Sequence, residues 1–294
     1  MTTHETITLS AGCKVNLYLR ITGRLDNGYH TLESLFMPLA RPCDTLELTF
    51  GPAPGKFSLY ADDPALAGDS NTIARAWRAF AERTGYAPEL TVRLTKGIPM
   101  GAGLGGGSAD AAAVLGALND RAGQRALAPQ ELAQLAAGIG ADVPFFLLNG
   151  PAWAEGIGDA LTPVALDLTG LTLLLLCPDV HVSTQWAYRT WDEYHIERAD
   201  RLQNRRDFLT CAKEKFKSSP CSRILLLNSF EDVVFPAHPK LRRYKEKLIS
   251  SGACAAVMSG SGASLLGLFR DSAQAEQCTR ELQGQALSAY LHRY

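Results

Sequence analysis

A glycine-rich run in the first half of the chain constrains the fold more than any other feature. It reads PMGAGLGGGSADAAA over residues 99–113, and five of the seven residues from Gly101 to Gly107 are glycine. Glycine loses more backbone entropy on folding than any other residue, so such a run is costly unless the chain turns tightly or another group approaches the main chain closely. We therefore expect a bound group against this stretch of backbone.

The segments on either side of the run predict a strand before it and a helix after it. Residues 90–94 alternate between apolar and polar side chains, as a half-buried strand does. Residues 109–118 are rich in alanine and favour a helix, with Ser108 as its N-cap. This arrangement gathers backbone N–H groups and the positive end of a helix, which favours a phosphate site. A tight connector without a ligand is the alternative.

Two other glycine motifs compete for the run. A P-loop requires Lys and then Ser or Thr after its last glycine, but Gly107 is followed by Ser108 and Ala109. The spacing Gly101-x-Gly103-x-x-Gly106 does match the dinucleotide fingerprint. That fold would next need a parallel strand ending in an acidic residue, whereas a polar loop at 119–128 and a second helical pattern follow. A nicotinamide or flavin enzyme is therefore disfavoured.

Composition excludes several classes of protein. The 294 residues are 46% hydrophobic and 20% charged, which is typical of a globular protein of one or two domains. A net charge of -1 offers no basic field for nucleic acid. The longest apolar run, 171–177, is too short to span a bilayer, and the first residues lack a signal-peptide pattern. We expect a cytoplasmic protein that binds neither nucleic acid nor a membrane.

The number and spacing of the cysteines also favour a cytoplasmic protein. The seven cysteines are scattered and form no C-x-x-C pair. An odd number without paired spacing disfavours both a disulfide framework and a zinc site. We expect reduced thiols.

The coarse pattern divides the chain into two parts. The first part predicts a turn at Asp26-Asn27-Gly28, helices at 71–83, 109–118 and 129–137, and strands at 6–22, 32–39, 44–50, 57–60 and 90–94. The second part predicts a strand at 171–177, a helical polar region at 184–217, a helix at 239–250, strands at 253–258 and 264–269, a helix at 272–282 and a strand at 287–292. The β-α-β-β-α-β order of the second part is typical of a ferredoxin-like domain. We place the boundary near residue 163, between domains 1–163 and 164–294.

Four stretches carry a resemblance to a known family. KGIPMGAGLGGGSADAAAVL from Lys96 resembles the phosphate-binding motif of the GHMP kinases, which include galactokinase, homoserine kinase, mevalonate kinase and phosphomevalonate kinase. Three more stretches are similar, in order and spacing, to one branch of that family. They are GCKVNLYLRITGRLDNGYHTLESLF from Gly12, GADVPFFL from Gly140 and MSGSGASLLGLF from Met258. The likeness covers nearly the whole chain, and its most specific element is the Tyr29-His30 pair after the turn.

The resemblance implies an α+β protein with two domains. It implies an N-terminal ribosomal-S5-domain-2-like α/β domain, which binds the nucleotide, and a C-terminal ferredoxin-like domain. The implied activity is ATP-dependent phosphorylation of the 2-hydroxyl of a cytidine diphosphate-linked methylerythritol, in the non-mevalonate (methylerythritol phosphate) isoprenoid pathway. ATP and Mg²⁺ are the implied cofactors, and a monomer or weak homodimer the expected assembly.

Two alternatives to this function stay open. One is another GHMP kinase that acts on a small alcohol such as mevalonate or homoserine, against which Tyr29 and His30 argue. The other is a non-catalytic metabolite sensor on the same fold. The presence of both Lys14 and Asp142 argues against a sensor, which has no need of that pair.

The resemblance assigns two catalytic residues. Asp142 matches the catalytic carboxylate of the family, which accepts the proton of the attacking hydroxyl. Taken alone, Asp142 reads as the cap of a short helix beginning at Val143. Lys14 is expected to face Asp142, keep it ionised and offset negative charge on the hydroxyl oxygen. Taken alone, a lysine in a strand points to solvent.

Further residues are expected around the nucleotide. Ser108 is the candidate Mg²⁺ ligand, and the family often has a second Ser where this chain has Ala109. Lys96 and Asn71 are expected to line the nucleotide pocket, although isolated polar residues are commonly just solvated. The complete nucleotide set is Asn71, Lys96, Pro99, Met100, Gly101, Ala102, Gly103, Leu104, Gly105, Gly106, Gly107, Ser108 and Ala109.

A second group is expected to hold the substrate. Asn16 shares a strand face with Lys14, because side chains two residues apart point the same way. Tyr29 is expected to stack on the pyrimidine and His30 to hydrogen-bond its polar edge, since stacking alone tolerates any base. Thr184 and Tyr188 complete the set, with Tyr188 as a second aromatic wall. The SGSG run at 259–262 reads locally as a hairpin connection, and in the family this loop closes over the phosphates.

Overall fold

The computed structural model describes residues 4–148, 150–196 and 226–294. The chain forms two compact units, each made of several segments. The first unit comprises 1–14, 38–99 and 105–149, and the second comprises 15–37, 100–104 and 150–294. Strands β1 (Glu5–Arg24) and β2 (His30–Gly51) pass through both units. This division differs in kind from a single boundary near residue 163, which stays a prediction.

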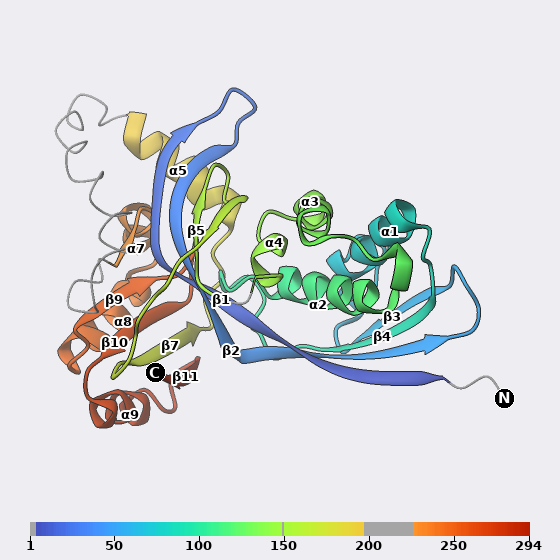
Figure 1. The fold of residues 1–294 in the computed structure, drawn as a ribbon. Coiled ribbons are helices and arrows are strands. Elements are labelled where there is room, and N and C mark those ends of the chain that lie inside the picture. The colour runs from blue at the N-terminus through green and yellow to red at the C-terminus, as the bar shows by residue number, and fades with distance from the viewer. Residues whose placement is uncertain (1–3, 149, 197–225) are drawn as a thin grey trace. The chain divides into compact units, whose positions relative to one another are not determined.

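The first unit is a mixed sheet covered by helices. Its strand order is β3-β4-β2-β1, with β3 (Phe57–Ala61) parallel to β4 (Glu89–Thr95) and β4 antiparallel to β2 over Thr45–Gly51. Helices α1 (Thr72–Thr84), α2 (Gly106–Arg121) and α3 (Pro129–Ile139) lie on one face of this sheet (Figure 1). Three short helical turns complete the unit: η1 (Pro64–Leu66), η2 (Gly123–Arg125) and α4 (Val143–Phe146).

The core of this unit follows from the two periodicities of the sequence. Alternate residues of β2 and β4 are buried and meet the apolar stripes of the helices. In α1 the predicted face of Ile73, Trp77 and Phe80 is buried, as expected. Asn71 begins α1 by accepting a hydrogen bond from the Ile73 N–H at 2.8 Å, and Gly85 ends it in the left-handed conformation.

Two local predictions in this unit are wrong. The strands expected at 32–39 and 44–50 are one continuous strand, β2, because Pro42 removes one N–H from the ladder without ending its pairing with the neighbouring strands. Ser108 is not the N-cap of α2: the helix begins at Gly106, and Gly105 holds the N-cap position with φ 72°. The left-handed glycine turns the chain early, so Gly106 and Gly107 enter the helix.

The second unit contains a four-stranded antiparallel sheet in the order β11-β7-β10-β9. These strands are β7 (Thr172–Pro178), β9 (Ala255–Met258), β10 (Leu265–Phe269) and β11 (Leu287–Arg293). Leu265 of β10 lies opposite Leu176 of β7 and Met258 of β9, which fixes the register. With helices α5 (Thr184–Ile196), α8 (Pro239–Ser250) and α9 (Ser272–Glu281), the order of elements is the predicted ferredoxin-like one.

Several elements of the second unit were not predicted. They are β5 (Ala152–Glu155), β6 (Ala160–Pro163), β8 (Leu227–Asn228) and α7 (Glu231–Ala237). Segments this short have no measurable period, and their partners supply the pairing: β5 with β2 at Ser34–Phe36, β6 with β5, and β8 with β1 at Tyr18 and Leu19. The rest of the helical region expected over 184–217, beyond residue 196, lies outside the described residues. Among the described helices, none has the length and apolarity needed to cross a membrane.

Gly97, just before the glycine-rich loop, makes a close backbone contact that yields a test of this fold. A Cβ at Gly97 would overlap the carbonyl oxygen of Cys43, which is main chain and has little room to move. We expect Gly97→Ala to destabilise the protein by about 1–3 kcal/mol, the usual cost of forcing an atom into a packed site. The thermal unfolding midpoint measures this effect.

Gly138→Ala is the matched control. Gly138 lies in α3, and an added Cβ there meets nothing within 4 Å. Alanine at a helical position should leave the midpoint unchanged or raise stability by up to about 1 kcal/mol. Equal midpoints for the two variants would show that the approach of residue 97 to Cys43 is looser than described.

Candidate active site

Lys14 and Asp142 form an ion pair in the first unit. Lys14 Nζ lies 3.5 Å from Asp142 Oδ2, and the lysine is buried with 5% of its surface exposed. Asp142 stands directly before α4, but its side chain makes no capping hydrogen bond there. A buried lysine needs an anionic partner. The pair is therefore the role of this carboxylate that the geometry supports, in place of the helix cap that local sequence suggests.

The second half of the glycine-rich loop packs beside this pair. Gly105 has φ 72°, and a Cβ there would come within 3.1 Å of the Phe146 ring and 3.2 Å of Lys14 Cγ. Only glycine combines that backbone conformation with so close an approach. Helix α2 therefore starts next to Lys14, with the free N–H groups of its first turn at Gly106 and Gly107, whereas the Ser108 N–H donates to the Gly105 carbonyl oxygen at 3.0 Å. Ala109 is buried in the helix.

The first half of the loop, Met100–Leu104, belongs to the second unit. Gly101 and Gly103 have φ 68° and 74°, and a Cβ on Gly103 would lie 2.7 Å from the Ser259 carbonyl oxygen. Ala102 and Leu104 are buried, whereas Met100 is 61% exposed. Glycine is thus required at alternate positions here for both conformation and space.

The SGSG run is the β9–β10 hairpin connection, as its local pattern indicated. The Ser259 hydroxyl accepts a hydrogen bond from the Asn16 backbone N–H at 3.0 Å. The amide of Asn16 in turn donates to Ser34 Oγ at 2.8 Å. Thr184, at the start of α5, has its hydroxyl 2.8 Å from that of Ser261. Two of the predicted substrate residues, Asn16 and Thr184, are therefore tied to this hairpin.

Asn228, which was not among the residues predicted from the sequence, also holds the hairpin. Its side-chain amide donates to the carbonyl oxygens of Met258 and Gly260, each at 2.7 Å. Its oxygen accepts from the Phe230 N–H at 2.8 Å. A single asparagine outside any motif gives no sequence signal, because its role depends on the carbonyl groups that folding brings next to it.

A buried charged cluster precedes the loop. Lys96 Nζ donates to Asp44 and, at 3.1 Å, to Asp110 Oδ2. The other oxygen of Asp44 accepts from the N–H groups of Gly97 and Ile98, both at 2.8 Å. The cluster fixes the chain where it leaves β4. Asp44 and Asp110 were not predicted; an aspartate on the apolar face of the helix at 109–118 was the available signal.

The cluster also bears on two predicted nucleotide contacts. The Lys96 ammonium is engaged by two carboxylates, and both ends of the Asn71 amide are used, one on Ile73 N–H and one on the Leu66 carbonyl. These bonds support structural roles for both residues. Contact of either residue with a nucleotide stays a prediction.

Burial raises the pKa of Asp110 to about 7. Desolvation is the largest cause and the neighbouring Asp44 adds to it, while Lys96 opposes both. A single lysine thus serves two buried carboxylates, and Asp110 keeps its proton up to about pH 7. The charge of the cluster therefore changes within the physiological range.

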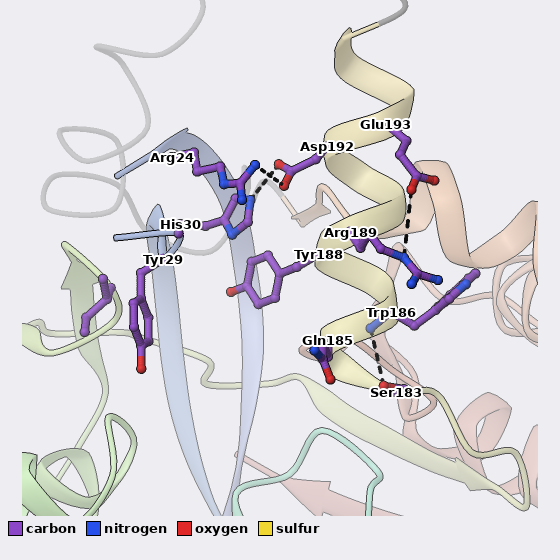
Figure 2. Close-up of a pocket in the computed structure, with 12 residues that line it drawn as sticks. Arg24, Tyr29, His30, Ser183, Gln185, Trp186, Tyr188, Arg189, Asp192 and Glu193 are labelled. Carbon is purple, nitrogen blue, oxygen red and sulfur yellow. Dashed lines mark hydrogen bonds and ion pairs between the residues drawn. The ribbon is translucent and has the colours of Figure 1, made fainter. Parts of the chain in front are cut away.

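A pocket of about 840 Å³ lies in the second unit, between the turn joining β1 to β2 and helix α5 (Figure 2). Three of the predicted substrate residues, Tyr29, His30 and Tyr188, line it. Tyr29 is 61% exposed, whereas His30 is buried. Thr184 lies between two lining residues, Ser183 and Gln185. A pocket of this size suits a small molecule with an aromatic group.

His30 is held tightly at the side of this pocket. Its Nε2 lies 2.6 Å from Asp192 Oδ1, and its ring stacks on Tyr188 with centroids 4.5 Å apart and planes 19° from parallel. Trp191 meets the imidazole edge-on at 6.0 Å. Asp192 also pairs with Arg24 at 3.3 Å. Neither the stacking of Tyr188 on His30 nor the contact of Asp192 with His30 was predicted from the sequence.

The family follows from comparison with known proteins. Residues 71–150 match the model for the GHMP kinases N terminal domain, and residues 217–288 match the model for the GHMP kinases C terminal domain. The structure of homoserine kinase from Cytophaga hutchinsonii has the same fold, with a TM-score of 0.70, 17% identity, and 98% of this chain and 93% of that chain covered. The chain belongs to the GHMP kinase family, and the predicted two-domain α+β fold is confirmed. Membership of this kinase family implies that the chain uses ATP.

Within the family, the chain is similar to 4-diphosphocytidyl-2-C-methyl-D-erythritol kinases. The protein of that name from Nitratidesulfovibrio vulgaris strain Hildenborough is 48% identical, covering 98% of this chain and 99% of that protein. The one from Oleidesulfovibrio alaskensis is 44% identical, with 97% and 98% covered. A crystal structure of 4-(cytidine 5'-diphospho)-2C-methyl-D-erythritol kinase is 31% identical with a TM-score of 0.74, covering 97% of this chain and 98% of that chain.

The raised pKa of Asp110 makes stability depend on pH. An unfolded aspartate loses its proton near pH 4, whereas folded Asp110 keeps it to about pH 7. Between these values the native state binds one more proton than the unfolded state, so the free energy of unfolding falls as pH rises from 4 to 7. Asn at position 110 does not titrate. The stability of Asp110→Asn relative to the original protein should therefore rise across this window, by at most about 1.4 kcal/mol for each step of one in pH.

Urea unfolding at pH 5 and pH 8 measures this difference. Asp120→Asn, at an exposed position of the same helix, is the control and should shift stability equally at both pH values. A relative stability of Asp110→Asn that is the same at pH 5 and pH 8 would mean that Lys96 keeps Asp110 ionised in the folded protein.

Proposed function

We propose that the chain transfers the γ-phosphate of ATP to the 2-hydroxyl of 4-diphosphocytidyl-2-C-methyl-D-erythritol, a reaction of the methylerythritol phosphate route to isoprenoids. The observation that carries this proposal is 48% identity over 98% of the chain to a kinase named for that substrate. The Lys14–Asp142 pair and the pocket around Tyr29 and His30 support it, because each suits one part of the reaction.

Asp142 and Lys14 are assigned to the acceptor hydroxyl. Asp142 Oδ2 is the base that accepts the hydroxyl proton as the oxygen attacks phosphorus. Lys14, 3.5 Å away, stabilises the ionised carboxylate and the negative charge that develops on the attacking oxygen. Transfer breaks the bond between the γ-phosphorus and its bridging oxygen and leaves ADP. The proton stays on Asp142 until solvent removes it.

The glycine-rich loop is assigned to the phosphates. Free N–H groups at the start of α2 are suited to bind anionic oxygens, and the helix dipole favours negative charge at that end. Gly105 allows this end of the helix to lie against Lys14. In the proposed enzyme the loop holds the nucleotide while Lys14 and Asp142 act on the acceptor.

Magnesium fits this donor set as a partner of the nucleotide. The described residues contain no cluster of three or more His, Cys, Asp or Glu that would cage a metal ion. Mg²⁺ commonly binds through substrate phosphates and water with only one or two protein oxygens, so a cage is not required. The Ser108 hydroxyl in the first turn of α2 would hold it, with the remaining ligands coming from the phosphates and water. When bound, the ion would neutralise charge on the β- and γ-phosphates.

The aromatic pocket is assigned to the cytidine group. The Tyr29 ring is exposed, so a base bound in the pocket can stack on it. Stacking contributes about 1–3 kcal/mol per base. His30 supplies a polar atom on a ring held by its neighbours. Asn16 and Thr184 are proposed to contact the rest of the substrate. The proposed enzyme is cytoplasmic and is a monomer or weak homodimer, which light scattering after gel filtration checks.

Loss of either member of the Lys14–Asp142 pair should affect turnover far more than nucleotide binding. We expect Asp142→Asn and Lys14→Ala each to lower kcat by about 10²–10⁴, the range for loss of a positioned base or of charge stabilisation. The Kd for ATP should change by less than about threefold, because these two side chains are expected to act on the acceptor hydroxyl in the transition state and not to bind the nucleotide in the ground state. Steady-state kinetics and calorimetry measure the two quantities.

Asp232→Asn is the control for this pair of variants. Asp232 is an exposed carboxylate of α7, and its loss should leave both kcat and the Kd for ATP unchanged. Turnover that persists in Asp142→Asn at the level of this control would remove Asp142 from the chemistry.

Parallel assays with three acceptors test the substrate. ADP release from Mg-ATP is measured with 4-diphosphocytidyl-2-C-methyl-D-erythritol, mevalonate and homoserine. We expect turnover with the first compound only, because the Tyr29–His30 pocket suits a base that the other two lack. Activity on mevalonate or homoserine alone would replace the proposed substrate. ATP binding without turnover on any of the three would favour a metabolite sensor.

A further inference from the structure

A short series of polar contacts stands behind His30 in the pocket. Asp192 of α5 places Oδ1 2.6 Å from His30 Nε2, and its other oxygen lies 3.3 Å from the Arg24 guanidinium (Figure 2). The side chains of Asp192 and His30 are 17% and 7% exposed. The contact with His30 is therefore shielded from most of the solvent. A hydrogen bond is stronger in such a low-dielectric environment than in water.

The Asp192 contact determines which nitrogen of His30 carries a proton. An ionised carboxylate only accepts hydrogen bonds, so the hydrogen in a 2.6 Å contact belongs to Nε2. In a neutral imidazole the other nitrogen is then an acceptor. Among the described residues, nothing hydrogen-bonds to Nδ1 of His30. The pocket is left with an acceptor at this position.

The ring is also fixed in direction. Tyr188 stacks on the face of the imidazole at 4.5 Å, and Trp191 packs against it edge-on. Arg24 holds the second oxygen of Asp192, which limits rotation of the carboxylate. An acceptor whose direction is set before binding loses little entropy when a ligand arrives.

We propose that Asp192, oriented by Arg24, is a positioning residue that fixes the proton of His30 on Nε2 and thereby makes the pocket select a pyrimidine with an amino group. Cytosine carries an amino donor where uracil carries a carbonyl acceptor. The acceptor at Nδ1 can take a hydrogen bond from the amino group of cytosine. It cannot pair with the carbonyl oxygen of uracil, so Nδ1 and that oxygen would both stay without a hydrogen bond. The choice of ligand rests on the proposed function, whereas the position of the proton does not.

Asp192 has a simpler alternative role as a tie between α5 and the β1–β2 turn. Such a tie would contribute to stability but would leave both the proton on His30 and the choice of base unchanged. Asp192→Asn separates the two roles, because a carboxamide donates as well as accepts and so lifts the constraint on His30. Glu246→Gln, at an exposed position of α8, is the matched loss of one carboxylate.

The first readout is the tautomer of His30 in the full chain without ligand. Proton–nitrogen correlation spectra of protein labelled with ¹⁵N-histidine report it, and His30→Gln assigns its signals among the six histidines. We expect the proton on Nε2 in the original protein and in Glu246→Gln, and a mixture of tautomers in Asp192→Asn. A proton on Nδ1 in the original protein overturns the proposal, whether or not the variant folds.

The second readout is the choice of base. The ratio of kcat/KM for the cytidylyl substrate to that for its uridylyl counterpart should fall about tenfold in Asp192→Asn, as expected for one hydrogen bond. The loss should appear in KM, with kcat for the cytidylyl substrate within about threefold of the original. Glu246→Gln should keep the original ratio. An unchanged ratio in a folded Asp192→Asn variant overturns the proposal.

The two readouts also distinguish failure of this proposal from failure of the proposed function. If the original protein phosphorylates no cytidylyl substrate, the proposed function fails while the tautomer spectra still report on Asp192. If it phosphorylates that substrate but the spectra of Asp192→Asn match those of the original protein, the proposed function stands and the role of Asp192 is wrong.

Discussion

Close approach to a bare backbone is the constraint on which the site depends. At Gly105 the main chain has φ 72°, and a Cβ there would lie only 3.1 Å from the Phe146 ring and 3.2 Å from Lys14 Cγ. The left-handed turn there starts α2 at Gly106 and so directs its free N–H groups beside Lys14. A buried ammonium and the positive end of a helix are thus brought together in the first unit. Such a region has a positive potential that attracts anions. The negative charge of the Asp142 carboxylate lowers that potential.

Buried polar side chains hold loops in each of the two units. Asp44 binds two N–H groups at the end of β4, and Asn228 binds two carbonyl oxygens of the β9–β10 hairpin. Each uses its hydrogen-bonding capacity on main chain that has no partner in a regular ladder. A buried group of this kind is costly to leave unpaired, so it specifies one loop conformation over its competitors. Asp192 serves an imidazole ring in the same way.

Much of the fold was predictable because its signals are local. The apolar face of α1, the bounds of α8 and the alternation of β4 each follow from a period that a short window reveals. The elements that escaped prediction, such as β8 and α7, are too short for any period to be seen. The joining of two expected strands into β2 depends on pairing with neighbours that are remote in sequence.

The sequence by itself determined the family and the glycine-rich loop, since these are matters of motif and spacing. It also indicated Lys14 and Asp142 through resemblance. Only the tertiary structure decided that Asp142 pairs with Lys14 instead of capping α4, that Lys96 is shared by two carboxylates, and that Asp192 lies against His30. The physical reason is that the proton, the pairing and the burial of a polar group are set by neighbours that only folding brings within hydrogen-bonding distance.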